Sequence, residues 1–168
     1  MDFELDPPRG VGPLHIGMVC SDAVAALQSL GNADATSECD NPRQYIFRSS
    51  GLMICTECSD NRLLAVELGR PETDADTVHF QGVDVFGLPA REVVERLRQR
   101  VSIEPAQDDP ASFVAPDLLL SLWRPFETDD DPAEEQGFYF NAVLLAAPGY
   151  YDTPAQTAER SRGTGGLS

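Results

Sequence analysis

The feature that most constrains the fold of this chain is a near-repeat in its sequence at an offset of 70 residues. The first copy reads Leu14-His15-Ile16-Gly17-Met18, and the second reads Asp84-Val85-Phe86-Gly87-Leu88. In both copies the glycine is followed by a hydrophobic residue at +1, a valine at +7 and a leucine at +10. A pattern that recurs at a fixed offset indicates that one structural unit occurs twice in the chain.

Each copy predicts a short extended segment that ends at the glycine, followed by a helix and then by strands. Ser21 is a suitable N-cap for the first helix, and Pro89 suits the first turn of the second. The strands expected after the two helices are residues 44–48, 52–58 and 62–68, then 112–114, 117–123 and 137–145. We therefore predict an α+β fold, a tandem duplication of a unit in which one helix packs on a small antiparallel sheet.

This pattern divides the chain into three segments. Residues 1–76 are predicted to form the first α+β repeat and residues 77–150 the second. Residues 151–168 lack apolar periodicity and are rich in polar residues and glycine, so we expect a disordered C-terminal tail.

The charge balance excludes several classes of partner. The chain carries 28 acidic residues against 12 Lys and Arg, a formal net charge of −16, and its sequence pI is about 4.2. Nucleic acids and anionic lipids bind clustered cations, so neither is expected as a partner. No apolar stretch approaches the roughly 20 residues that span a bilayer. A basic protein is the partner that this charge favours.

The cysteines bear on the compartment and on redox chemistry. The acidic N-terminus lacks the basic start and the apolar run of a secretory signal, so if Met1 is the true start we expect a cytoplasmic protein with reduced thiols at Cys20, Cys39, Cys55 and Cys58. If an export signal has been removed from the protein, Cys20 and Cys39 could instead form a disulfide. Cys55 and Cys58 form a C-x-x-C, but positions three apart on a strand point to opposite faces. We interpret them as structural thiols, with a redox or zinc role as the alternative.

No arrangement of residues indicates a catalytic centre. His15 and His79 each lie at the entrance to one repeat, without a nucleophile beside them in any known motif. We therefore expect no catalytic residue, no metal and no cofactor. One alternative is a small ligand-binding or thiol-dependent enzyme domain that uses Cys55, Cys58 or His79. Another is a DNA mimic, which would need carboxylates spaced like phosphates.

The candidate partner-binding residues combine aromatic anchors with carboxylates. Strand alternation places Trp123 and Tyr139 on the outward faces of their strands, and it places Ala142 and Leu144 inward. Residues 127–135 form an acidic loop, which is either a contact for a basic partner or a solvated loop. The outward face is either a binding surface or is covered by the other repeat. The predicted contacts are Glu57, Glu67, Trp123, Asp129, Asp130, Asp131 and Tyr139.

The segment Leu14-His15-Ile16-Gly17-Met18 with Val24 resembles the glycine-methionine signature of the beta-lactamase inhibitor proteins and of the BamE-type outer-membrane assembly lipoproteins. That signature usually has threonine after the methionine and valine six positions after the glycine, whereas here Val19 follows and Val24 is seven away. The resemblance implies two small sheets side by side that form a concave surface for a partner protein. It transfers no binding residue. Because an acidic face can meet a basic active-site cleft, we expect a non-enzymatic, immunity-type inhibitor of a basic toxin or enzyme.

Overall fold

The computed structural model describes residues 1–31, 33–35, 41–128 and 130–150; the predicted tail, 151–168, lies outside them. The first half contains β1 (Asp2–Asp6), β2 (Gly10–Val11), β3 (Leu14–His15), α1 (Cys20–Ser29), β4 (Ala33–Ala35), β5 (Arg43–Phe47), β6 (Met53–Ser59) and β7 (Arg62–Gly69). The second contains β8 (Thr77–Phe80), β9 (Val83–Asp84), α2 (Ala90–Arg98), β10 (Glu104–Ala106), β11 (Asp109–Ala115), the 3-10 turn η1 (Pro116–Leu118), β12 (Leu120–Trp123), α3 (Glu135–Phe138) and β13 (Ala142–Ala146).

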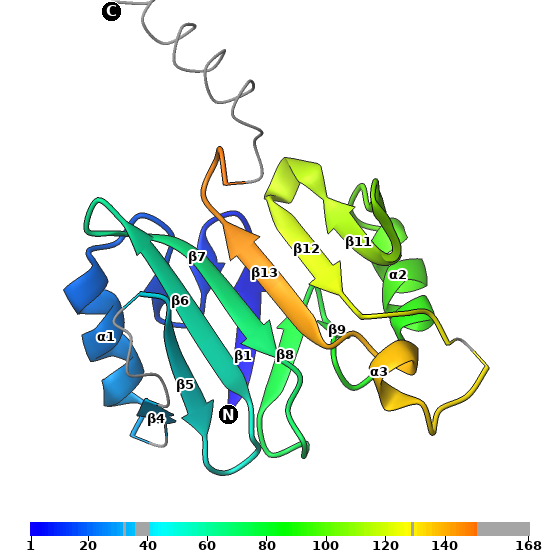
Figure 1. The fold of residues 1–168 in the computed structure, drawn as a ribbon, viewed down its shortest axis with the longest axis horizontal. Helices are drawn as coiled ribbons and strands as arrows, with labels where there is room; N and C mark the ends of the chain where they lie inside the picture. The colour runs from blue at the N-terminus through cyan, green and yellow to red at the C-terminus, as the bar shows by residue number, and fades with distance from the viewer. Residues whose placement is uncertain (32, 36–40, 129, 151–168) are drawn as a thin grey trace, which may run out of the picture.

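The strands form two sheets, and both sheets contain strands from the two halves of the chain (Figure 1). The larger sheet has eight strands in the order β10-β11-β12-β13-β7-β6-β5-β4. Its two four-stranded parts are joined by antiparallel pairing of β13 with β7, in which Val143 lies opposite Leu68. The smaller sheet has five strands in the order β3-β2-β1-β8-β9, and its β1 and β8 are parallel.

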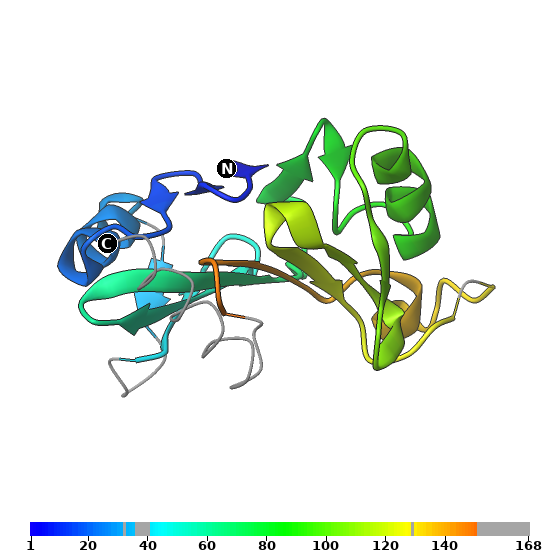
Figure 2. The same ribbon diagram turned by 90° about the horizontal axis from the view of Figure 1, so that it is seen from above.

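The hydrophobic core lies between the two sheets. Figure 2 shows the five-stranded sheet above one face of the eight-stranded sheet, with α1 and α2 at opposite ends of the molecule. Phe3 of β1 meets Phe47 of β5 edge to face, with ring centroids 5.4 Å apart. Leu27 of α1 and Leu97 of α2 complete the same buried cluster. One face of the large sheet is therefore covered by the core.

The predicted α+β class is wrong, because the fold is mostly β. Strands make up 41% of it and helices 18%, in sheets of five and eight strands with three helices among the described residues. The helices α1 and α2 have only ten and nine residues, and a second sheet supplies much of the layer that the helices were expected to supply. Most strands of this second sheet have two to four residues, too short for periodicity to reveal.

The strand predicted over 137–145 is shorter than expected, and the residues that it points into the core differ from those expected. Gly137 belongs to α3, and the strand β13 begins only at Ala142. Val143 and Leu145 are buried, whereas Leu144 is half-buried on the other face of the sheet. Pairing with both neighbouring strands determines which residues of β13 face the core, since Leu144 lies opposite Glu67 of β7 and Ser121 of β12.

A disulfide joins Cys20, the first residue of α1, to Cys58 near the end of β6, with Cα atoms 6.4 Å apart. The expectation of reduced thiols is therefore wrong for these two residues, and so is the alternative pairing of Cys20 with Cys39. Cys39 itself lies outside the described residues. Cys55 is a free thiol, so the C-x-x-C does not form a disulfide of its own.

None of the helices in the described residues combines the length and the apolar character that crossing a bilayer requires.

Replacement of both Cys20 and Cys58 by alanine should lower the free energy of unfolding by about 2–4 kcal/mol, because the cross-link restricts the unfolded chain. Urea unfolding of the double variant and of the wild type, with and without dithiothreitol, measures this. Reductant should shift the wild type toward the double variant and leave the double variant unchanged. Equal midpoints for the oxidised and reduced wild type would contradict the prediction.

Candidate protein-binding face

The eight-stranded sheet has one face away from the five-stranded sheet, which we call the outer face (Figure 2). The register places Ser121, Leu144, Glu67 and Cys55 in one row across β12, β13, β7 and β6. Side chains in such a row point to the same face of a sheet and are near neighbours. The row crosses the β7–β13 junction, so the outer face is continuous between the two halves of the chain.

A hollow opens on the outer face at this junction. It is lined by Glu67, Ser121, Trp123, Ala142 and Leu144. Trp123 lies opposite Ala142 and is 47% exposed, which is unusual for so large an apolar side chain. Two predicted contact residues from different halves of the chain, Glu67 and Trp123, thus line one hollow.

The carboxylate of Glu67 lies in this hollow without a partner of its own. Burial raises the pKa of Glu67 above its ordinary value. Across the residues that the structure describes, no hydrogen bond or ion pair reaches this side chain. The hollow therefore contains a partly desolvated carboxylate that no cation of the described residues compensates.

Glu57 and Cys55 occupy neighbouring positions on β6. The Glu57 carboxylate accepts a hydrogen bond of 2.8 Å from the hydroxyl of Tyr150, so it has a partner within the chain. Burial, reinforced by the charges of Glu67 and Glu57, raises the pKa of the Cys55 thiol. A raised pKa keeps the thiol protonated and opposes the nucleophilic chemistry of the thiol-enzyme alternative.

The acidic loop follows β12 beside the outer face. Asp130 and Asp131 are exposed, and neither forms an ion pair within the described ranges. Asp129, also predicted as a contact, lies outside the described residues. The loop therefore presents at least two unneutralised carboxylates near the strand that bears Trp123.

Arg124 holds the base of this loop and is only 2% exposed. Its Nε donates to the carbonyl of Ala111 at 2.7 Å, and its Nη1 donates to the carbonyl of Gly137 at 2.8 Å. Its Nη2 lies 4.0 Å from the carboxylate of Glu127. No motif in the sequence points to Arg124; its position directly after a predicted strand, in a chain with few cations, is the one indication that the sequence contains.

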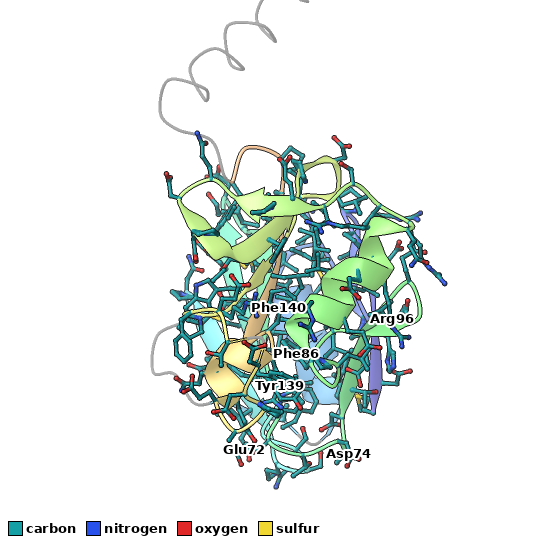
Figure 3. All side chains as sticks on the ribbon, turned by 90° about the vertical axis from the view of Figure 1, so that its right-hand side faces the viewer. Glu72, Asp74, Phe86, Arg96, Tyr139 and Phe140 are labelled. Atoms are coloured by element: carbon teal, nitrogen blue, oxygen red, sulfur yellow. A yellow bond between two sulfur atoms is a disulfide. The ribbon has the colours of Figure 1, made fainter. Side chains whose placement is uncertain are left out.

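Tyr139 lies apart from the hollow. The guanidinium of Arg70 stacks 4.1 Å from the centroid of its ring and also pairs with Glu135 at 3.3 Å. Figure 3 shows Tyr139 toward the same end of the molecule as Glu72 and Asp74. Arg70 thus already occupies one face of the Tyr139 ring.

The connection between the halves contains acids of two kinds. Glu72 and Asp74 are exposed, whereas Asp76 is 3% exposed. Burial alone would raise the pKa of Asp76, but hydrogen bonds from Ser50, the N-terminal ammonium and Ser49 lower it. Asp76 is therefore a structural carboxylate that no partner can reach.

The described residues contain no group of three or more His, Cys, Asp or Glu that could hold a metal ion. His79 lies on the five-stranded sheet, where its Nδ1 is 2.6 Å from the carboxylate of Asp2. Hydrogen bonds from His79 and then Thr77 lower the pKa of Asp2. This pair ties β8 to β1 and does not face the hollow.

Comparison of the chain with protein-family models, with curated proteins and with solved structures gave no match.

Substitution of Arg124 by methionine should lower the free energy of unfolding by about 2–4 kcal/mol, because two buried carbonyls lose their donors. Urea unfolding measures the change. Arg96, whose ion pair with Glu92 lies on the exposed side of α2, provides the matched control. Arg96→Met should cost no more than about 1 kcal/mol, and equal losses for the two variants would contradict the role of Arg124.

Substitution of Glu67 by glutamine should stabilise the free protein at neutral pH. A folded-state pKa above the unfolded one means that stability decreases as the pH rises through this interval, and glutamine removes that decrease. Unfolding at pH 7 and at pH 3.5 measures it: the gain at pH 7 should vanish at pH 3.5, where both states are protonated. Glu57→Gln is the control, because this acid has a hydrogen-bond partner and its loss should not stabilise.

Proposed function

We propose that this protein is a non-enzymatic module that binds a basic protein through the outer face of its eight-stranded sheet. The observation that supports this most directly is the hollow in which an exposed tryptophan and an unpartnered carboxylate lie together. Interface hot spots combine aromatic anchors with charged groups near the centre of a contact. An immunity-type inhibitor of a basic toxin or enzyme is the class of protein that fits this surface.

The distribution of charge supports a basic partner. The net charge of −16 attracts cationic proteins over several ångströms and raises their rate of association. Asp130 and Asp131 extend the negative charge of the hollow beyond the sheet. Three exposed arginines, Arg91, Arg96 and Arg98, lie on α2, and no arginine of the described residues lines the hollow. The same balance disfavours nucleic acid and anionic membrane as partners.

The disulfide bears on where binding would occur. Disulfides persist in oxidising compartments and are rare in the cytosol. The Cys20–Cys58 cross-link therefore favours a proposed site of action outside the cytosol, in place of the cytoplasmic location expected from the sequence.

A photo-crosslinking amino acid at position 125, an exposed site two residues after Trp123, keeps the side chains of the hollow in place and, introduced in the native cells, tests the proposal. We expect it to capture a protein of high pI, and we expect the same group at Glu95, which is exposed on α2, to capture none of it. The purified complex should weaken steeply between about 50 and 500 mM salt, because exposed charges are screened over this range. Capture of only acidic proteins, or equal capture from both positions, would refute the proposal.

A further inference from the structure

The hollow on the outer face has chemically different walls. Glu67 supplies a carboxylate from β7, Leu144 and Ala142 supply an apolar floor from β13, and Trp123 supplies an indole from β12. Trp123 and Glu67 are separated by two strand spacings and two residues along the strands, so their Cα atoms lie about 12 Å apart. The hollow lies between these two side chains.

Glu67 has no partner within the described residues, whereas Glu57 and Glu135 each have one. Glu57 accepts a hydrogen bond from Tyr150, and Glu135 pairs with Arg70. A desolvated carboxylate without a partner opposes folding at neutral pH. A residue that opposes folding in this way is typical of a functional site, where the missing partner comes from a ligand.

The chain itself contains the arrangement that would satisfy the hollow. The guanidinium of Arg70 lies 4.1 Å from the centroid of Tyr139 and 3.3 Å from the carboxylate of Glu135. One cation there is held by an aromatic face and a carboxylate together. Trp123 and Glu67 offer the same two groups, with the better cation-binding ring and without an arginine of the described chain between them.

We infer that the hollow is a socket for one arginine side chain of the basic partner, with its guanidinium stacked on Trp123 and hydrogen-bonded to Glu67. This inference rests on the proposed function and specifies the chemistry of its contact. Arginine fits better than lysine because its flat guanidinium stacks on a ring while its edge donates two hydrogen bonds to a carboxylate. Leu144 would pack against the apolar part of the same side chain.

The single tryptophan of the chain provides a direct reporter, since its fluorescence comes only from the hollow. The probes are the peptide acetyl-Ala-Arg-Ala-amide and its lysine and citrulline counterparts, titrated at fixed ionic strength. We expect a saturable change with the arginine peptide, several-fold weaker binding of the lysine peptide, and none of the citrulline peptide, which has the shape of arginine without its charge.

Glu67→Gln should weaken binding of the arginine peptide about tenfold or more, although this variant is expected to be more stable than the wild type. Glu95→Gln changes the net charge equally but lies on α2, and it should bind within twofold of the wild type. Equal binding by Glu67→Gln and the wild type, or equal binding of the citrulline and arginine peptides, would overturn the socket.

The two proposals fail in different ways. If a basic protein is captured at position 125 and binds Glu67→Gln as tightly as the wild type, the socket is refuted and the proposed function stands. If the arginine peptide binds as expected but crosslinking captures no basic protein, the socket stands and the proposed function is refuted.

Discussion

The pairing of β7 with β13 is the interaction on which the rest of the surface depends. It joins two four-stranded meanders, which come from different halves of the chain, into one sheet. Glu67 lies on one side of this junction, and Ala142 and Trp123 lie on the other. Without the pairing, the acid and the indole would belong to separate sheet edges and the hollow between them would not exist. The five-stranded sheet closes the other side of the core, where parallel β1 and β8 again connect the two halves.

Local pattern was enough to predict part of the candidate site. Alternation correctly placed Trp123 on the outward face, because β12 is regular over its length, although this strand begins at Leu120 and not at residue 117. The same reasoning failed for Leu144, since the chain folds into α3 first and the strand restarts at Ala142. The two neighbouring strands determine which side chains of β13 point into the core, and the sequence of β13 alone does not reveal this.

The prediction of the fold class was wrong for a related reason. Periodicity reveals helices and strands long enough to repeat their pattern, and α1 and α2 were visible in this way. The strands β2, β3 and β9 have two residues each, so they are defined by their partners and not by their composition. The disulfide likewise joins residues 38 positions apart, and spacing could not choose between Cys39 and Cys58 as the partner of Cys20. In each case a contact between distant segments decided the outcome.

The few cations of this chain are distributed in a way that explains why one carboxylate is left alone. Two of them bind the segment around the acidic loop. Arg124 donates a hydrogen bond to the carbonyl of Gly137, and Arg70 pairs with the carboxylate of Glu135. No cation of the described residues reaches Glu67, although its burial makes an unpaired charge more costly there than on an exposed carboxylate. A surface selected only for solubility would place its acids where water compensates them fully. A half-buried acid beside an exposed indole instead lowers the stability of the free protein at neutral pH, and a cationic group of the proposed partner would restore that free energy.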